Sequence, residues 1–401
     1  MKTSIDIAII GAGPQALTLV THLLQKKKLM RNRLMVFDPS GRWMQQWYHQ
    51  FSAFQIPHLR SPSPHHPHPN PQALRNFGEH RRHDFFPPYD LPGTQLFQDF
   101  CEDLIQNLPL QNTVYPARVL SLAPLQRKFQ LYLSTGETLT ARRVVLAVGA
   151  GKPIIPDWAK QLSSLHLRHQ LCHSSQIDLR NLSLRGERIL IVGGGLTSGH
   201  LALGATKLGA TVILMARRDF QEKLFDADPG WLGPKYLKGF WAETNWYQRF
   251  QLLQTARNGG SMTPSVMTKL RQQQHQGKVI LSPHCEVKQA VWEGDYWQVD
   301  CNNGQCLNVD RIWLGTGHET NVEEHPLLSL IRERYPMEVI NGLPVLDSHL
   351  RWQGCELFMM GAWAGLQVGP VARNIAGARM ASDLIVPALT KRSLTLTQSV
   401  R

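Results

Sequence analysis

The stretch ILIVGGGLTSGHLALGATKLGATVILMARR, residues 189–218, decides the fold of this chain. It reads as an apolar strand, a glycine turn, a helix and a second strand. Its turn, Gly193-x-Gly195-x-x-Ser198, has the spacing of a dinucleotide-binding turn. There the first glycine permits the tight turn, the second lets the backbone approach a pyrophosphate, and a small third residue lets the helix pack on the strand. The helix N-terminus then presents free N–H groups to the phosphates.

The chain opens with the same pattern. IAIIGAGPQALTLVTHLL, residues 7–24, contains Gly11-x-Gly13-x-x-Ala16 directly after a buried apolar strand. The next strand, in RLMVFDPS, ends at Asp38, whose carboxylate can accept hydrogen bonds from a ribose 2′-hydroxyl. An unphosphorylated adenosine ribose, as in FAD or NAD, fits an acid there. The alternative, a strand–helix turn without a ligand, does not explain Asp38.

The strand after the second turn ends in Arg217-Arg218 instead of an acid. Two guanidiniums at this place can hold a 2′-phosphate through charge-assisted hydrogen bonds, which favours NADPH over NADH. A solvated loop is the alternative. Two such turns in one polypeptide predict that FAD at the first site is reduced by hydride from NADPH at the second.

The composition sets limits on partners. Of 401 residues, 42% are hydrophobic and 18% are charged, which argues against disorder. The net charge of +13 permits nucleic-acid binding, but the longest basic run is Lys26–Lys28, so we expect anionic cofactors and no nucleic acid. No apolar run approaches the roughly 18 residues that cross a bilayer. We therefore expect no integral membrane contact and a cytoplasmic location.

Cysteines and histidines give no metal or disulfide signal. The six cysteines are scattered without a C-x-x-C pair. Cys301 and Cys306 have the C-x-x-x-x-C spacing of dithiol flavoenzymes, but they follow no glycine-rich FAD turn, so a dithiol mechanism is disfavoured. In SPSPHHPHPNP the prolines force alternate directions, and no cysteine or carboxylate lies near. We expect no metal there, and either a loop beside the flavin or a plain surface loop. The role of this segment is left open; its histidines are His65, His66 and His68.

These observations predict an α/β fold with two Rossmann-like three-layer nucleotide-binding domains, one nested in the other. We expect an FAD-binding domain at residues 1–157 and 312–401 and an NADPH-binding domain at 158–311. A helical insertion, rich in tryptophan and tyrosine, is expected at about 220–276.

The two turns resemble those of the two-dinucleotide flavoprotein superfamily, in which each unit is closed by an apolar strand ending in glycine. VVLAVGAGKPIIP, residues 144–156, looks like the crossover into the NADPH domain, and RIWLGTGHE, residues 311–319, like the return. LFMMGAWAG and GPVARNIAGARMAS, within residues 357–382, resemble the closing FAD motif, where a helix N-terminus meets the flavin ring. Ala362 stands where many members have Asp. The resemblance implies cofactor contacts at Gly149, Gly317 and Gly361.

Further motifs resemble the flavin-dependent monooxygenase branch. SGRWMQQW, residues 40–47, is similar to its Gly-x-Trp segment, which implies flavin contacts for Trp43 and Trp47. HLRSPSP, residues 58–64, looks like the Leu-Arg-x-Pro stretch of ornithine and lysine N-hydroxylases, and more loosely like the Leu-Arg-Thr-Asn stretch of flavin-containing monooxygenases. This places Arg60 in the cofactor-binding set.

Three segments depart from these relatives. Phe54-Gln55 stands where N-hydroxylases have Lys-Asp, and NGGSMT, residues 258–263, where they have Thr-Asn-Tyr. The Phe-x-Gly-x-x-x-His motif of flavin-containing monooxygenases is reduced to Leu167-x-His169-x-x-x-His173. The substrate is therefore left open.

The expected activity is that of an FAD-dependent, NADPH-consuming monooxygenase. A flavin hydroperoxide would oxygenate a small nucleophilic substrate, at an amine nitrogen or at sulfur, with oxygen as co-substrate. No catalytic side chain is singled out, because the cofactor carries the chemistry. Two alternatives stay open, an NADPH-dependent flavin reductase or dehydrogenase and a non-catalytic, redox-sensing flavin-binding module. A homo-oligomer is also left open.

Overall fold

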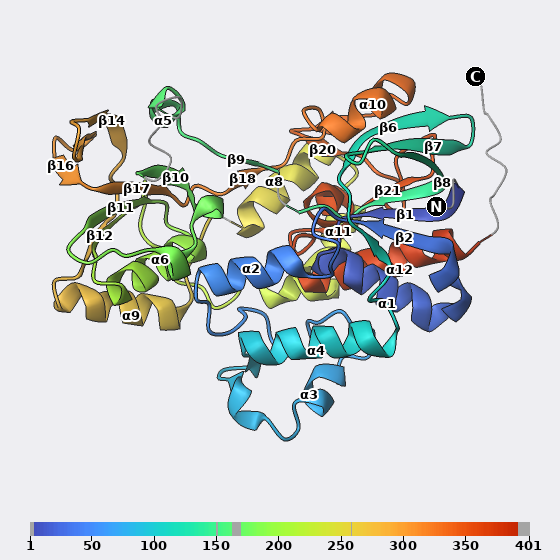
Figure 1. Cartoon of the computed structure of the whole chain (residues 1–401), viewed down its shortest axis with the longest axis horizontal. Coiled ribbons are helices and arrows are strands. Elements are labelled where there is room, and N and C mark those ends of the chain that lie inside the picture. The colour runs from blue at the N-terminus through green and yellow to red at the C-terminus, as the bar shows by residue number, and fades with distance from the viewer. Residues whose placement is uncertain (1–3, 150, 163–169, 258, 392–401) are drawn as a thin grey trace.

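The computed structural model describes residues 4–149, 151–162, 170–257 and 259–391. Two sheets stand side by side, one around β1 and the other around β11, with α8 between them (Figure 1). No helix in these described ranges is long and apolar enough to cross a membrane.

The first sheet has the strand order β5-β2-β1-β8-β7-β6, with β21 paired to β8. β1 runs parallel to both neighbours, and Ile9 lies opposite Val36 and Val145. β6, β7 and β8 are antiparallel, and the expected hairpin turn at Gly136 is confirmed. The strands are β1 (Ser4–Ile10), β2 (Leu34–Phe37), β5 (Val114–Tyr115), β6 (Val119–Leu125), β7 (Lys128–Leu133), β8 (Thr138–Leu146) and β21 (Leu357–Met359).

Two helices pack on one another beneath this sheet, α1 (Pro14–Lys26) and α12 (Ile375–Thr390) (Figure 1). α1 begins with Pro14 at its first helical position, where the missing N–H has no intrahelical partner to lose. The last four residues of β1, Ile7–Ile10, are buried, as expected for a central parallel strand covered on both faces. The sheet thus holds the N-termini of both helices at its carboxyl edge.

The second sheet is parallel throughout, in the order β10-β17-β11-β12-β13. α6 (Leu196–Lys207) and α9 (Pro264–His275) cover one face, and a small antiparallel sheet, β14-β15-β16, covers the other. This is a three-layer arrangement. The strands are β10 (Leu171–His173), β11 (Arg188–Val192), β12 (Thr211–Met215), β13 (Val279–Ser282), β14 (Val287–Trp292), β15 (Trp297–Cys301), β16 (Cys306–Val309) and β17 (Arg311–Leu314).

The chain leaves the first sheet and returns to it at one place. β9 (Lys152–Pro153) pairs antiparallel with β18 (His318–Glu319), so the two connections lie side by side. The N–H of Ile154 donates to Gly317 O at 3.0 Å, and Thr316 Oγ1 donates to Ile154 O at 2.5 Å. The second sheet therefore lies within a segment that is inserted into the first.

The segment between β12 and β13 is largely helical, as the sequence predicts. It contains α7 (Pro234–Ala242), α8 (Trp246–Arg257) and α9. Phe240 and Leu253 pack with Leu343 and Leu366, which belong to the chain around β20 (Leu343–Pro344) and α11 (Gly365–Val368). The insertion thus closes over the first unit.

The proline-rich stretch is ordered mostly without regular structure. It holds α3 (Ala73–Phe77), the 3-10 helix Arg82–Asp84, β3 (Phe85–Phe86) and β4 (Leu91–Pro92), and α4 (Thr94–Asn107) follows. Arg379 of α12 holds it by donating to the carbonyls of His66, His68 and Pro69. The remaining short helices are α2 (Gln45–Ala53), α5 (Asp157–Lys160) and α10 (Ser329–Arg334), and β19 (Val339–Ile340) pairs with β20.

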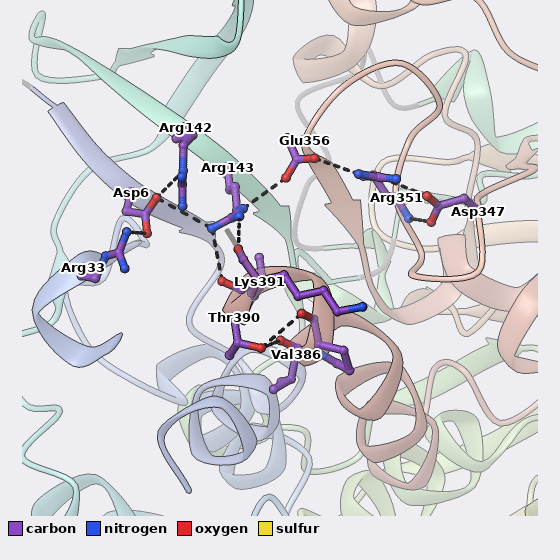
Figure 2. Close-up of polar contacts among 12 residues, drawn as sticks. Asp6, Arg33, Arg142, Arg143, Asp347, Arg351, Glu356, Val386, Thr390 and Lys391 are labelled. Carbon is purple, nitrogen blue, oxygen red and sulfur yellow. Dashed lines mark hydrogen bonds and ion pairs between the residues drawn. The ribbon is translucent and has the colours of Figure 1, made fainter. Parts of the chain in front are cut away.

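A buried cation fixes the other end of α12 (Figure 2). Arg143, on β8, is 2% exposed and lies 3.1 Å from the Glu356 carboxylate and 3.8 Å from Asp6. Its guanidinium also donates to Leu389 O at 3.2 Å and to Lys391 O at 2.9 Å. The sheet thereby supplies donors to a carbonyl in the last turn of α12 and to the one directly after the helix.

Candidate functional site

A cavity of about 2250 Å³ lies between the two sheets. Its wall combines the glycine turn after β11, the end of β12, the β17–β18 connection, the chain before α12, and part of the helical insertion. The sequence-predicted residues that line it are Arg60, Gly193, Gly195, Arg217, Arg218 and Gly317. The other predicted residues are not among the described residues that line this cavity. They are Gly11, Gly13, Ala16, Asp38, Trp43, Trp47, Gly149, Ser198 and Gly361.

Backbone conformation and packing require glycine at only one of the two glycine positions of the first turn. Gly11 has φ +98°, and a Cβ there would lie 2.7 Å from Ala147 O, so only glycine fits. Gly13 has φ −84°, and a Cβ would meet no atom within 4 Å. Neither conformation nor packing explains glycine at this second position. The open face beside Gly13 therefore fits a group from outside the chain that approaches the backbone closely.

The second turn repeats this contrast. Gly193 has φ +138° and no room for a side chain against Gly315 O. Gly195 has φ −94°, and a Cβ would make only an ordinary contact at 3.7 Å. Ser198 is fully buried against Gly315, where a side chain would collide with Ser198 Oγ. Gly315 is thus required for helix–strand packing, and the G-T-G spelling of residues 315–317 was the signal that could have identified it.

Asp38 is tied to the first turn. Its Oδ2 accepts from the N–H of Ala12 at 3.2 Å, and its Oδ1 accepts from Ser40 N at 3.0 Å and Ser40 Oγ at 2.6 Å. Ala16 is buried in the core between helix and strand. A carboxylate offers about four acceptor positions, so Asp38 keeps capacity for a hydroxyl donor.

Gln15, which the sequence analysis did not single out, joins the two helix N-termini. Its Nε2 donates to Ala372 O, Arg373 O and Asn374 O at 3.2–3.3 Å, directly before α12. Its Oε1 is buried and has no partner among the described residues. Because a buried acceptor left without a donor is unfavourable, this atom suits a donor on a bound cofactor.

The glycines at strand ends occupy different surroundings. Gly149 follows β8 and is exposed, with open space where a Cβ would stand. Gly317 has φ +84°, and its carbonyl oxygen lies 3.0 Å from His173 Nε2. Gly361, after β21, has φ +69° and lies next to Gln15. Ala362 lines the large cavity directly. Leu167 and His169 lie outside the described residues.

The two tryptophans lie in aromatic and core packing. Trp43 is 5% exposed, and its indole N–H donates to Leu110 O at 3.0 Å. Trp47 stacks on Phe51 with ring centroids 3.9 Å apart and contacts Phe97 of α4. Both belong to the core of the first unit, and Trp47 lies in the packing between α2 and α4.

The paired arginines after β12 occupy unequal positions. Arg217 is exposed at the cavity wall. Arg218 is half-buried against Gly259 and Gly260, and its Nη2 donates to Gly260 O at 3.5 Å. Arg217 is therefore the more accessible of the two for a phosphate.

Arg60 lies at the junction of the proline-rich loop and the insertion. It donates to Leu224 O at 2.9 Å, Lys223 O at 2.7 Å and Ser261 Oγ at 2.9 Å. Burial lowers its pKa, whereas nearby Asp226 opposes that shift. Arg257 and Arg373, also missed in the sequence, line the same cavity. Around Asp226 these three arginines leave a local excess of positive charge.

The histidines of the proline-rich loop separate in the structure. His65 lines the cavity, whereas His66 is fully buried against Phe100. Burial, and secondly Arg379, lowers the pKa of His65 to about 4 and that of His66 to about 3. Within the described residues no three His, Cys, Asp or Glu side chains gather as a metal-binding group.

The cysteines with dithiol-like spacing lie on β15 and β16, at the small antiparallel sheet. Cys301 is buried and Cys306 is exposed, and neither is among the described residues that line the large cavity. The cysteine on that wall is Cys285.

Comparison with known proteins agrees with this geometry. Residues 8–151 match a family described as FAD-NAD(P)-binding. The L-lysine N6-monooxygenase of Escherichia coli is 26% identical over 387 residues, covering 88% of this chain and 86% of that protein. An ornithine N-hydroxylase from Kutzneria, solved with reduced FAD, NADP⁺ and L-ornithine, superposes with a TM-score of 0.78 at 17% identity, covering 96% and 99% of the two chains. The FAD-bound cadaverine monooxygenase from Erwinia amylovora gives 0.76 at 14% identity, covering 99% and 98%.

The fold and the site define a flavoprotein with two dinucleotide-binding turns. Residues 8–151 match an FAD-NAD(P)-binding family, and over most of its length the chain is similar to flavin-dependent monooxygenases.

Proposed function

We propose that this protein oxygenates the nucleophilic nitrogen of a small amine, with NADPH as reductant and oxygen as co-substrate. The observation that carries the proposal is that one continuous cavity reaches from the Gly193 turn to the N-terminus of α12. A nicotinamide held at the first end and a flavin at the second can meet in this space. The N-hydroxylating relatives cover nearly the whole chain, which supports an amine over a sulfur substrate.

We assign the cofactors by the two turns. Residues 1–157 and 312–401 form the FAD-binding domain, and residues 158–311 form the NADPH-binding domain with its insertion. FAD is assigned to Gly11, Gly13, Ala16 and Asp38, with Gly149, Gly317 and Gly361 beside it. NADPH is assigned to Gly193, Gly195, Ser198, Arg217 and Arg218. Trp43 and Trp47 support the FAD site through packing, and Arg60 stands where the two cofactors and the substrate would meet.

Several groups that line or adjoin the cavity favour this reaction by their charge, their position or their exclusion of water. The N–H groups at the start of α12 offer partial positive charge to a flavin that gains electrons. Gln15 fixes the backbone in front of that helix. Apolar side chains from the insertion, Phe225, Leu232, Phe250 and Leu253, line the wall and exclude water. When bound, FAD supplies hydride acceptance and oxygen activation, for which we propose a flavin hydroperoxide.

The residues at the substrate-binding positions differ from those of the amino-acid hydroxylases. Phe54, where those enzymes have lysine, is 3% exposed and packs in the core of the second unit. It therefore presents no charge to a substrate. The positive charge on this wall comes instead from Arg60, Arg257 and Arg373.

Stopped-flow absorbance tests the proposal. The FAD-loaded protein is reduced with NADPH without oxygen and is then mixed with oxygenated buffer. An oxygenated flavin species that persists while NADP⁺ stays bound, together with hydroxylamine formed from L-lysine, L-ornithine or cadaverine, is the expected result. Fast reduction followed by direct return to oxidised flavin with stoichiometric peroxide would identify a flavin reductase instead.

A further inference from the structure

A second cavity, of about 300 Å³, lies behind the dinucleotide-binding turn. It sits in the groove between α6 and α9 and is closed at one end by residues 54–60. Ligand pockets in proteins usually range from about 300 to 1,000 Å³, so it has room for one small molecule. No step of the proposed reaction uses it.

The rim of this cavity is cationic. Lys207 at the end of α6, Lys269 on α9 and Lys278 before β13 line it, together with His58 and His200. Among the described residues on its wall there is no aspartate or glutamate. The three lysines form no ion pair with a described residue. Their charges therefore add up on this wall, and no described acidic side chain pairs with them.

The floor is apolar. Phe54 and Val266 are buried at 3% and 5% exposure and line the cavity with Leu196 and Leu203. Those two leucines lie seven residues apart on α6, which places them on one helix face with His200 between. A ligand in this place would meet hydrocarbon at one end and ammonium groups at the other.

His200 lies in the cavity close to the positive charges of its wall. Its ring makes no hydrogen bond with a described residue, although the side chain is half-buried. Burial, followed by the charges of His58, Lys269 and Lys207, lowers its pKa to about 4. His200 is therefore neutral near pH 7 and can donate or accept one hydrogen bond to a bound group.

We propose that this second cavity binds a small organic carboxylate, with the lysines on the carboxylate and Phe54, Leu203 and Val266 on its hydrocarbon part. Arg60 and Leu196 line both cavities. A ligand in the second cavity thus touches, from behind, the first residue of α6 and the arginine that holds the insertion. Occupancy of the second cavity therefore changes the affinity for NADP⁺. This coupling rests on the cofactor assignment proposed above.

Calorimetric titration of the FAD-loaded protein with octanoate tests the site. We expect saturable binding of one octanoate, weakened about tenfold or more in the triple variant K207Q/K269Q/K278Q, which corresponds to about 1.4 kcal/mol. The control K26Q/K27Q/K28Q removes the same charge from exposed residues at the end of α1 and should bind octanoate as the parent does. Because all six lysines are exposed, both variants should fold.

The remaining outcomes separate the site from general charge effects. 1-Octanol should bind at least about tenfold more weakly than octanoate, because it lacks the carboxylate. Absence of octanoate binding, equal binding by both triple variants, or equal affinity for octanol would overturn the proposal. Loss of binding in K288Q, from the large cavity, would place the anion there and overturn it too. These titrations need no turnover, so they stand even if the monooxygenase assignment fails. An NADP⁺ affinity unchanged by saturating octanoate would overturn the coupling alone.

Discussion

The Asp226 carboxylate lies 2.6 Å from Arg257 Nη2, inside the cavity that separates the two sheets. Arg60 Nη1 stands on its other side at 3.7 Å. The pair joins the start of the insertion to the end of α8, and Arg257 also donates to Pro370 O at 3.1 Å, close to α12. The Asp226 carboxylate thus links the helical insertion, through Arg257, to the chain before α12, the helix assigned to the flavin.

Replacing this carboxylate should loosen that wall. Asp226→Asn leaves Arg60 and Arg257 without a counter-charge, and we expect a loss of about 1–2 kcal/mol in the free energy of unfolding, because the pair is three-quarters buried. Urea unfolding measures it. The matched control is Asp157→Asn, whose ion pair with Lys160 is almost fully exposed and should leave the unfolding midpoint unchanged. Equal midpoints for both variants would contradict a structural role for Asp226.

The first turn predicts opposite effects for its two glycines. Gly11→Ala forces alanine to φ +98° against Ala147 O and should destabilise the cofactor-free protein by about 2 kcal/mol. Gly13→Ala meets open space, so that stability should not change. FAD affinity should nevertheless fall by about tenfold or more, because the methyl group occupies the approach of the phosphates. Unfolding curves of the apoprotein and flavin fluorescence titrations separate the two effects. Full FAD affinity in Gly13→Ala would argue against the assignment.

Arg217 should decide between the two nicotinamide cofactors. Arg217→Ala removes one guanidinium from a 2′-phosphate, and we expect kcat/KM for NADPH to fall about 10- to 100-fold. NADH carries no such phosphate, so its kcat/KM should stay within about twofold. Arg218→Ala is the less clean variant, because that side chain also packs on Gly259 and Gly260. Parallel losses for both cofactors in Arg217→Ala would exclude specific phosphate recognition.

Half-buried histidines should make the stability of the fold sensitive to acid. The folded-state pKa lies at about 4 for His65 and His200, below the ordinary 6.5. Because the unfolded chain binds these protons first, stability is fully present above pH 6.5 and is lost as pH falls toward 4. Urea midpoints between pH 8 and 5 measure this slope. His65→Gln should reduce proton uptake on unfolding by up to about one proton. An unchanged slope in His65→Gln would show that this imidazole is not desolvated.

The buried Arg143 on β8 should contribute more to the free energy of unfolding than Arg351, which binds the same Glu356 (Figure 2). Arg143→Met leaves Glu356 Oε2 and the carbonyls of Leu389 and Lys391 without the guanidinium donor, and we expect a loss of about 3 kcal/mol in the free energy of unfolding. Arg351→Met, which breaks a more exposed pair with the same Glu356, should cost only about 1 kcal/mol. Chemical denaturation of both variants gives the comparison. A larger loss in Arg351→Met would reverse the assigned roles.

The sequence by itself determined the local architecture. Continuous apolar runs followed by glycine turns at Gly11 and Gly193 specify strand–turn–helix units, because only glycine adopts those positive φ values without strain. The parallel strands, the hairpin at Gly136 and the helical insertion follow from patterns within a few residues, and the structure has all three. Such features depend on near neighbours and were therefore readable.

Tertiary structure alone decided how distant segments meet. Gln15 reaches Ala372, more than 350 residues away, and Arg60 reaches Ser261 across the two units. Asp226, Arg257 and Arg373 carry no motif, so no local pattern marked them as a charged wall. Trp43 looks in sequence like a flavin contact, and only the tertiary structure adds that its buried indole donates to Leu110 O. Spacing sets backbone conformation, whereas the charge and shape of the cavity arise only where separate elements pack together.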